Sequence, residues 1–355
     1  MEAAPPEVPR SLLEADPAAL RSFVVARGGK PFHAKVLRRA VLERGVLEYD
    51  QITDLPAGLR AILEQELPIF SGRLVDQRTA ADGTRKLLIE FPGRSEGEGP
   101  VSVETVHIPP ARPERDPNKG ATLCVSSQAG CPVACPFCAS GLLGLARNLR
   151  AHEIVEQYVR GRALGPLSRS VVMGIGEPLL NYPQLSAALD TVRDEMGLGG
   201  RKLTVSTVGF PDRLRRLAPD KPRFQLAISL HTPDQEQRDR LVPAMAGVPI
   251  EEVLAAGDDW FHKTGREVTY EYVLLGGEND SEGHALRLLD RLRGRRCSVN
   301  LIPYNPTPEL PFDRPEGGSP ERFRDVLVEG GLTATIRWSR GLEGAAACGQ
   351  LRLVR

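Results

Sequence analysis

The sequence predicts an α/β fold in which a parallel sheet forms a partial (β/α)6 barrel, preceded by a small helical accessory domain. From residue 121 onward, six strand-like runs alternate with helix-like runs, which is typical of a parallel sheet with right-handed crossovers. Six such units fall short of the eight that close a complete barrel. Before residue 69, apolar residues recur instead at helical spacing.

Residues 1–68 are expected to form the helical accessory domain. Helices are predicted from Ser11 to Ala26, from His33 to Arg44, and after the turn at 54–56. Between residues 20 and 44 the sequence has one acidic residue, Glu43, and seven basic residues: Arg21, Arg27, Lys30, Lys35, Arg38, Arg39 and Arg44. A second basic cluster comprises Arg287, Arg291, Arg293, Arg295 and Arg296. Such clusters bind phosphates, but they are equally typical of solvated helix faces, so charge alone leaves both interpretations open.

Residues 69–120 are predicted to be a β-hairpin-like extension and linker. Strand-like alternation covers Lys86–Phe91 and Val101–Ile108, with a glycine-rich loop between them. Residues 109–120 are rich in proline and charge, which favours a surface loop.

Residues 121–355 are predicted to form the barrel core. The expected strands are 121–126, 169–174, 203–207, 224–231, 268–275 and 298–304. The expected helices are 152–164, 183–196, 211–218, 251–263, 282–293 and 320–330. Sites in such barrels lie at the carboxyl ends of the strands, so the functional residues are expected in the loops that follow them.

The composition limits the classes of protein to which the chain can belong. The chain is 41% hydrophobic and 26% charged, and no apolar run approaches the roughly 18 residues of a membrane span. The acidic, proline-bearing start is typical of neither a signal peptide nor a transit peptide. Four of the six cysteines lie within fifteen residues, which indicates metal or redox chemistry in a reducing compartment and therefore a cytoplasmic protein.

The loop after the first barrel strand carries Cys131, Cys135 and Cys138 in a C-x3-C-x2-C pattern. Three thiolates on one short loop suit a [4Fe-4S] cluster, because soft sulfur ligands select soft metals. The fourth iron is then open to the amino and carboxylate groups of S-adenosylmethionine, the arrangement of radical S-adenosylmethionine enzymes. The alternatives are three buried core cysteines or a zinc site whose fourth ligand is remote in sequence.

Polar and glycine residues follow the later strands. The run 174–178, GIGEP, resembles the motif with which radical enzymes hold the methionine amino group, and it contains Gly176 and Glu177. Other candidate ligand contacts at strand ends are Ser206, Ser229, Leu230, His231 and Asn305. Taken singly, each is as well explained as a turn or cap residue. Cys124, Cys297 and Cys348 are, by themselves, typical of small core residues.

These motifs together resemble the RlmN/Cfr family of radical S-adenosylmethionine RNA methyltransferases. The likeness runs almost end to end, from the N-terminal helices through TLCVSSQAGCPVACPFCASG, VVMGIGEPLLNY, LTVSTVGFP, LAISLHTPDQEQRDRLVPA and VNLIPYNP to ACGQL. The VSSQ-GC loop and the terminal ACGQL are more specific than the cysteine triplet alone.

The resemblance implies a two-stage reaction. One S-adenosylmethionine methylates Cys348; a second is cleaved to a radical that abstracts hydrogen from this methyl group, and the resulting carbon radical adds to adenine. Cys124 then forms a disulfide with Cys348 and releases the methylated base. Glu104, in VETV, matches the family's proton acceptor.

The resemblance also implies the ligands and partners. Cys131, Cys135 and Cys138 would bind the cluster, and S-adenosylmethionine would be contacted by Gly176, Glu177, Ser206, Ser229, Leu230, His231 and Asn305. The implied substrate is carbon 2 of an adenosine in 23S rRNA (the adenosine 2503 site), with adenosine 37 of tRNA as a second substrate. The N-terminal helices would recognise folded RNA. An electron donor such as a flavodoxin and a monomeric state are also expected.

The chain departs from the family pattern in four places. Glu343 is the only acid in GLEGAAACGQL, where the family has an acidic run, and the run 337–341 is RWSRG where the family has an RKTRG-like run. In addition, STVGFP is one residue short and 109–120 is longer. Action on another RNA therefore stays open as an alternative. Carbon-8 methylation of the Cfr type stays open as well, because both chemistries use the same cysteines. Outside this class, the alternatives are a radical enzyme for a small molecule or peptide, and a non-enzymatic iron–sulfur or zinc protein that binds RNA.

Overall fold

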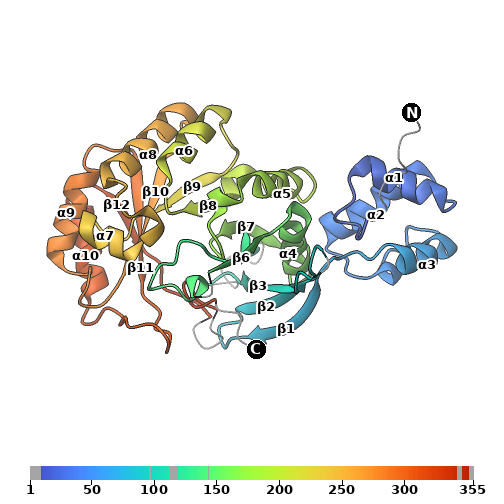
Figure 1. Ribbon diagram of the computed structural model, residues 1–355, viewed down its shortest axis with the longest axis horizontal. Coiled ribbons are helices and arrows are strands. Elements are labelled where there is room, and N and C mark those ends of the chain that lie inside the picture. The colour runs from blue at the N-terminus through green and yellow to red at the C-terminus, as the bar shows by residue number, and fades with distance from the viewer. Residues whose placement is uncertain (1–8, 96, 112–118, 143, 342–345, 352–355) are drawn as a thin grey trace.

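The computed structural model describes residues 9–95, 97–111, 119–142, 144–341 and 346–351. Part of the long loop 109–120 and Glu343 lie outside the described residues. Within them, ten strands form one sheet in the order β1-β2-β3-β4-β7-β8-β9-β10-β11-β12 (Figure 1).

The parallel part of this sheet confirms the predicted barrel. All neighbours from β4 through β7 to β12 pair in parallel. Their bounds are β4 Ala121–Cys124, β7 Leu167–Val172, β8 Leu203–Thr207, β9 Gln225–Ser229, β10 Val268–Leu274, β11 Cys297–Pro303 and β12 Thr333–Ile336. The last of these, β12, was not expected from the sequence.

Helices connect the parallel strands as predicted, and Figure 1 shows them on the outer side of the sheet. They are α4 Ala151–Ala163, α5 Tyr182–Asp194, α6 Pro211–Leu217, α8 Ile250–Thr264, α9 Glu282–Leu292 and α10 Ser319–Glu329. A short helix that the sequence did not predict, α7 Gln235–Leu241, lies between β9 and α8. The apolar faces of these helices point toward the sheet, where side chains such as Tyr158, Val192 and Trp260 are buried.

The extension continues the barrel sheet. Strands β1 Arg73–Thr79, β2 Arg85–Phe91 and β3 Val101–Ile108 are antiparallel, and β3 pairs with β4. In that pairing Val106 lies opposite Cys124. Because alternate residues of a strand share a face, Glu104 is on the same face of the sheet as Cys124.

The N-terminal module consists of α1 Pro17–Ala26, α2 Pro31–Arg44 and α3 Ala57–Glu66. The first helix starts later than the Ser11 predicted, because Asp16 caps it: the Asp16 carboxylate accepts bonds from the N–H groups of Ala18 and Ala19 at 2.8 and 3.0 Å, and Pro17 occupies the first turn. The second helix ends at Gly45, in the left-handed conformation.

Specific polar contacts attach the N-terminal module to α4 and α5, beside which it lies in Figure 1. The guanidinium of Arg38 in α2 forms an ion pair with Glu195, just after α5. Arg162 of α4 donates to the carbonyl of Leu42 at 2.9 Å and to that of Met196 at 2.6 Å. One arginine thus ties the end of α2 to the end of α5.

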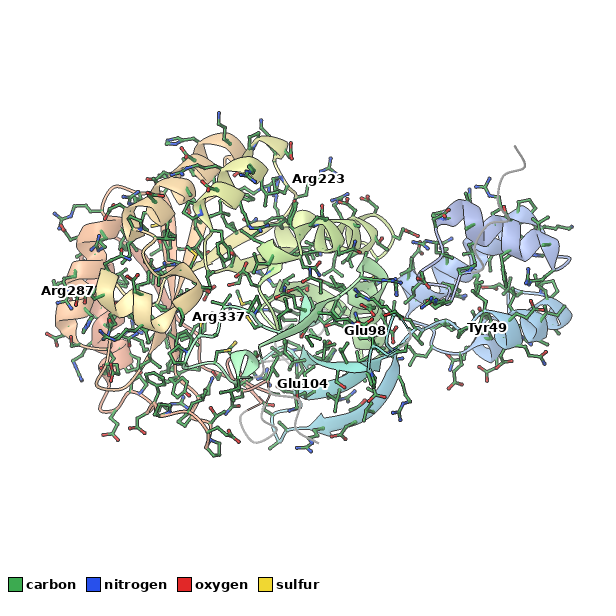
Figure 2. The ribbon with its side chains drawn as sticks, viewed as in Figure 1. Tyr49, Glu98, Glu104, Arg223, Arg287 and Arg337 are labelled. Carbon is green, nitrogen blue, oxygen red and sulfur yellow. The ribbon has the colours of Figure 1, made fainter. Side chains whose placement is uncertain are left out.

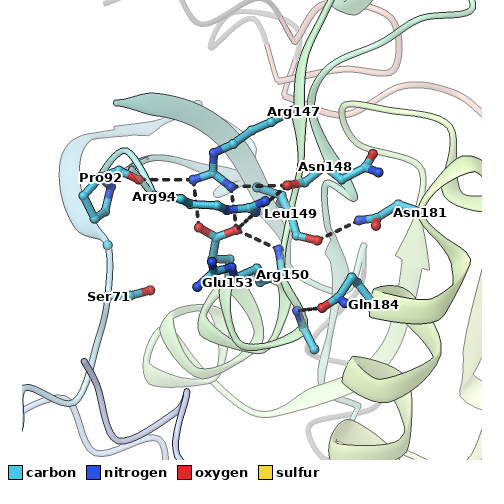
Figure 3. A network of polar contacts seen from close by, with 12 residues as sticks. Ser71, Pro92, Arg94, Arg147, Asn148, Leu149, Arg150, Glu153, Asn181 and Gln184 are labelled. Atoms are coloured by element: carbon cyan, nitrogen blue, oxygen red, sulfur yellow. Dashed lines mark hydrogen bonds and ion pairs between the residues drawn. The ribbon is translucent and has the colours of Figure 1, made fainter. Parts of the chain in front are cut away.

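A small second sheet positions the cysteine loop. Strands β5 Gln128–Gly130 and β6 Leu145–Asn148 form an antiparallel hairpin whose connection carries the three cysteines. Figure 3 shows the network that fixes the base of this hairpin. There the Glu153 carboxylate of α4 accepts two bonds from Arg147, both at 2.8 Å, one from Arg94 at 3.0 Å, and one from the N–H of Arg150 at 2.7 Å.

No helix among the described residues is both long and apolar enough to cross a membrane.

Candidate active site

The cysteine loop is held in shape by its own backbone. The N–H of Cys131 donates to the carbonyl of Gly144 at 3.0 Å, and that of Cys138 to the carbonyl of Cys135 at 3.1 Å. Ala134, between the first two cysteines, has a φ of 56°, which a non-glycine residue rarely adopts. Burial raises the pKa of the Cys131 thiol to about 11 and that of Cys135 well above its usual range, so binding a metal has to displace their protons.

Among the residues the structure describes, no three Cys, His, Asp or Glu side chains are close enough together to bind one metal ion. A [4Fe-4S] cluster binds each cysteine at a different iron atom, so it requires thiols that are farther apart than the ligands of one zinc ion. Three cysteine thiols on one short loop match the protein donors of a [4Fe-4S] cluster that keeps its fourth iron open to another ligand.

Glu177 and Gly176 lie where β7 gives way to the short helix η3 Pro178–Leu180. The Glu177 carboxylate is buried and accepts bonds from the N–H groups of Leu179 and Val208, both at 2.9 Å. Burial raises its pKa. Gly176 has a φ of +108°, and a Cβ there would meet the Cβ of Gln128 at 2.6 Å. The exit of β7 is thus packed directly against the cysteine hairpin.

Four more of the predicted contacts lie at the ends of β8 and β9. The Ser206 and Ser229 hydroxyls are 3.5 Å apart. His231 packs edge-to-face on Phe137 of the cysteine loop, with ring centroids 5.0 Å apart. Burial, with a smaller effect of the Arg238 charge, lowers the pKa of His231 to about 3, so its ring is neutral. Leu230, which lies between Ser229 and His231 in the sequence, is fully buried and donates its N–H to the carbonyl of Glu271.

Asn305, after β11, connects this edge to the Cys348 segment. Its amide nitrogen donates to the Ser339 hydroxyl at 2.7 Å and to the Cys348 carbonyl at 3.2 Å. Its oxygen is buried without a hydrogen-bond partner in the described part of the chain. Buried amide oxygens rarely lack a partner, so this atom fits a ligand donor such as an amino or hydroxyl group.

The Cys348 segment is hydrogen-bonded to the cysteine loop, although the two are far apart in sequence. The N–H of Ala139, next to Cys138, donates to the carbonyl of Gly349 at 2.9 Å. The Ser140 hydroxyl donates to the carbonyl of Leu351 at 2.9 Å. These bonds hold Cys348 beside the loop that carries the three cysteines.

Cys124 and Cys348 line the same cavity of about 180 Å³. Cys124, at the end of β4, is buried, and its burial raises the pKa of its thiol to about 12. Cys348 is exposed at the surface of the cavity, and desolvation by the protein around its thiol raises its pKa as well. Further lining residues, mostly apolar, are Ile108, Val171, Met173, Ile302 and Leu351. Both sulfurs are free thiols.

Glu104 does not line this cavity but lies on the same face of the sheet. Its carboxylate is buried and forms an ion pair with Lys86 of β2 at 2.7 Å. The Ser126 hydroxyl donates to the Glu104 carbonyl at 2.7 Å, which connects β3 to the segment just before the cysteine hairpin. Figure 2 shows Glu104 and Arg337, a cavity residue, in the central part of the molecule.

Arg238 of α7 is a site residue that the sequence did not reveal. It is fully buried and donates one bond, from Nη2 to the carbonyl of Val208 at 2.8 Å. Its Nε and Nη1 are buried without partners among the described residues. The Arg238 charge acts on both Cys135 and His231. A buried cation with spare donors fits an anionic group at the cysteine loop, such as a thiolate-bound cluster or a carboxylate.

Comparisons with known proteins agree with this geometry. Residues 125–289 match the radical SAM superfamily, and residues 10–69 match the ribosomal RNA large subunit methyltransferase N-terminal domain. A probable dual-specificity RNA methyltransferase RlmN of Rhodopirellula baltica is 43% identical over 94% of this chain and 88% of its own length. The corresponding protein of Gloeobacter violaceus is 44% identical over 94% and 92%.

Among solved structures, a radical SAM methyltransferase from Sphaerobacter thermophilus superposes with a TM-score of 0.86 at 39% identity. The superposition covers 97% of this chain and 99% of that one. The chain therefore belongs to the RlmN family of radical S-adenosylmethionine RNA methyltransferases, which use a [4Fe-4S] cluster and S-adenosylmethionine.

Proposed function

We propose that this enzyme methylates carbon 2 of an adenosine in 23S rRNA, at the adenosine 2503 site, with adenosine 37 of tRNA as a second substrate and Cys348 as the methyl carrier. The observation that supports this most strongly is that Cys124 and Cys348 line one cavity while the Cys348 segment is hydrogen-bonded to the cysteine loop. A protein that merely bound RNA through an iron–sulfur site would have no use for this cysteine pair.

In this proposal Cys131, Cys135 and Cys138 hold the cluster, and the residues at the strand ends hold S-adenosylmethionine. The latter are Gly176, Glu177, Ser206, Ser229, Leu230, His231 and Asn305. When bound, the two groups supply the methyl carbon and one-electron chemistry. The unpartnered oxygen of Asn305 supports a ligand contact. Glu177 has a largely structural role, because its carboxylate already accepts hydrogen bonds from two backbone N–H groups.

The two cysteines then have complementary roles. Cys348 carries the methyl carbon on its sulfur into the cavity, where that carbon bonds to adenine. Cys124 attacks the Cys348 sulfur, and an S–S bond forms as the bond from that sulfur to the transferred carbon breaks. That carbon keeps the bonding electron pair and takes up a proton, so the base is released with a methyl group. Because burial raises the pKa of Cys124 to about 12, its thiol must lose a proton in this step. Glu104, paired with Lys86, is the proposed proton acceptor for the adenine.

The test is methylation of unmodified 23S rRNA by enzyme reconstituted without oxygen, with digested nucleosides compared against 2-methyladenosine and 8-methyladenosine. We expect 2-methyladenosine, whereas 8-methyladenosine would transfer the assignment to carbon 8. Cys348→Ala should abolish methylation while the cluster's visible absorption is retained. Cys297→Ala is the matched control, since Cys297 lies at the start of β11, and it should keep full activity. An active Cys348→Ala variant would refute the carrier role.

We also propose that the enzyme works as a cytoplasmic monomer and receives its electron from a small donor protein such as a flavodoxin. Reduction of the reconstituted cluster by a purified flavodoxin tests the electron donor. Light scattering, which measures the molar mass of the enzyme in solution, tests the monomeric state.

A further inference from the structure

The rim of the cavity that holds Cys124 and Cys348 carries a tryptophan, Trp338, two residues after the end of β12. Its side chain is 53% exposed, whereas the only other tryptophan, Trp260, is fully buried in the core. The backbone beneath it is fixed, because the N–H of Arg337 donates to the carbonyl of Leu301 in β11 at 2.8 Å. Trp338 thus follows a residue that is hydrogen-bonded to β11, and it lines the cavity with about half of its surface exposed to solvent.

The contacts of Trp338 within the protein do not account for this exposure. Arg314 lies over the ring at 5.8 Å from its centroid, a weak contact at an exposed site. The π-face of an exposed aromatic side chain stacks readily on nucleobases, and this one lies beside the two cysteines of the cavity. The neighbouring Arg337 supplies positive charge at the same rim, where its field acts on both Cys124 and Cys348.

We propose that Trp338 stacks on an adenine of the RNA substrate and so holds that base over Cys348. This rests on the proposed function, since it takes the Cys124–Cys348 cavity as the place where RNA is methylated. The chemistry recognised is the flat face of an adenine, and the adenine of S-adenosylmethionine is the other possible source. Arg340, also at the rim, is occupied by Asp82 and the carbonyl of Pro109, so the indole and Arg337 are the groups left to meet RNA.

Tryptophan fluorescence separates the two sources of adenine. Trp260 is buried, so a ligand that stacks at the rim changes the emission of Trp338 alone. Reconstituted enzyme is titrated with unmodified 23S rRNA transcript and, separately, with S-adenosylmethionine. We expect the RNA to quench the emission, S-adenosylmethionine alone to leave it unchanged, and the quenching to disappear in Trp338→Phe. Quenching by S-adenosylmethionine alone, or equal quenching by RNA in Trp338→Phe, would overturn the assignment.

Kinetics provide the second measurement. Trp338→Ala should raise the KM for RNA about tenfold, and Trp338→Phe, which keeps an aromatic face, should raise it less. Leu286→Ala is the matched control, because Leu286 is similarly exposed (58%) but lies on α9. It should leave the KM unchanged. Equal thermal unfolding of the three variants excludes a folding defect, and an unchanged KM in Trp338→Ala overturns the proposal.

Methylation of Cys348 in the absence of RNA tests the proposed function separately. If Cys348 stays unmethylated while RNA still quenches Trp338, the carrier role fails and the stacking contact stands. If Cys348 is methylated and RNA leaves Trp338 unquenched, the carrier role stands and the stacking contact fails.

Discussion

Buried polar atoms without a hydrogen-bond partner are uncommon in folded proteins, and two residues that carry such atoms adjoin the cofactor site of this enzyme. Asn305 has a spare acceptor beside the Cys348 segment. Arg238 has two spare donors, and its charge acts on Cys135. A cluster with three thiolates is anionic, so a buried guanidinium beside it would stabilise the extra electron of the reduced state.

Arg238→Gln should therefore lower the midpoint potential of the cluster. We expect a shift of tens of millivolts, since about 59 mV corresponds to a tenfold change in a one-electron equilibrium. A potentiometric titration followed by electron paramagnetic resonance measures it, with iron content confirming equal loading. Arg287→Gln is the control, because Arg287 is paired with Asp234 on the surface. Equal potentials for the wild type and Arg238→Gln would contradict this role.

How far individual site residues can be predicted depends on what identifies them. The three cysteines proposed as cluster ligands follow from their spacing. Cys124, Cys348 and Glu104 follow only from the family resemblance, because the nearness of Cys124 to Cys348 is created by the fold. Arg238 escaped prediction because an arginine in the polar run QEQRDR is typical of a solvated helix face. Its burial arises from packing of α7 against the exit of β8.

At the scale of elements, the strand exits fix the positions of the residues proposed to contact S-adenosylmethionine. Gly176 is the tightest of these positions, since its φ is positive and Gln128 lies against it. Gly176→Ala should lower the free energy of unfolding by about 2 kcal/mol through backbone strain and weaken S-adenosylmethionine binding by displacing Glu177. Thermal unfolding and calorimetric titration check both effects. Gly199→Ala, where a Cβ meets open space, should be neutral; equal behaviour of the two variants would contradict the account.

The Glu153 network is the second element-scale feature, because it joins α4 to the hairpin that carries the cysteines (Figure 3). Glu153→Gln should destabilise the protein by about 3 kcal/mol, since it leaves the buried Arg147 without a full counter-charge. Chemical unfolding at pH 7 measures this. Glu251→Gln, which removes an exposed partner of Arg291, is the control and should cost far less.

The loss of stability in Glu153→Gln should also depend on pH. Burial alone would raise the pKa of Glu153, but the bonds from Arg147 and the Arg150 N–H outweigh it and lower the pKa below 4.5. A carboxylate with a lowered folded-state pKa stabilises the protein above its unfolded-state pKa and loses that effect as pH falls through the folded-state value. The difference between wild type and Glu153→Gln should therefore be full at pH 7 and shrink below pH 4.5. A difference that persists at low pH would contradict the ion-pair explanation.

The alternation of strands and helices was predictable because each buried strand is a short apolar run between amphipathic helices. Two elements were not. Strand β12 has only four residues, half of them exposed, so its sequence shows no clear pattern. Helix α7 is seven residues long and almost wholly polar. Both are stabilised by their packing on the barrel rather than by local preference.

At the scale of the whole molecule, the structure distinguishes the two basic clusters. In the second cluster Arg287, Arg291, Arg295 and Arg296 form ion pairs with acidic residues, which leaves Arg293 as the single exposed member outside the ion pairs of the described residues. In the N-terminal module Arg27, Arg38, Arg39 and Arg44 are likewise paired. Arg21, Lys30 and Lys35 are exposed, and the ion pairs of the described residues do not include them.

These three residues are therefore the best candidates for phosphate contacts. Replacing Arg21, Lys30 and Lys35 together by Gln should weaken RNA binding and flatten its salt dependence by about 0.7 to 0.9 logarithmic units per lost contact. Binding measured over a range of salt concentrations checks this. The triple replacement of Arg287, Arg291 and Arg296 is the matched control and should leave the slope unchanged. If the salt dependence of RNA binding became flatter in the control variant alone, the RNA would bind the barrel and not the N-terminal module.

The most direct test of the account examines Cys348 itself. Enzyme reconstituted without oxygen is given S-adenosylmethionine, and the tryptic peptide 341–352, GLEGAAACGQLR, is analysed by mass spectrometry. The account predicts one added methyl group on the Cys348 sulfur, dependent on S-adenosylmethionine. An unmodified Cys348 in enzyme with a fully assembled cluster would contradict the carrier role of Cys348, and with it the proposed methyl-transfer mechanism.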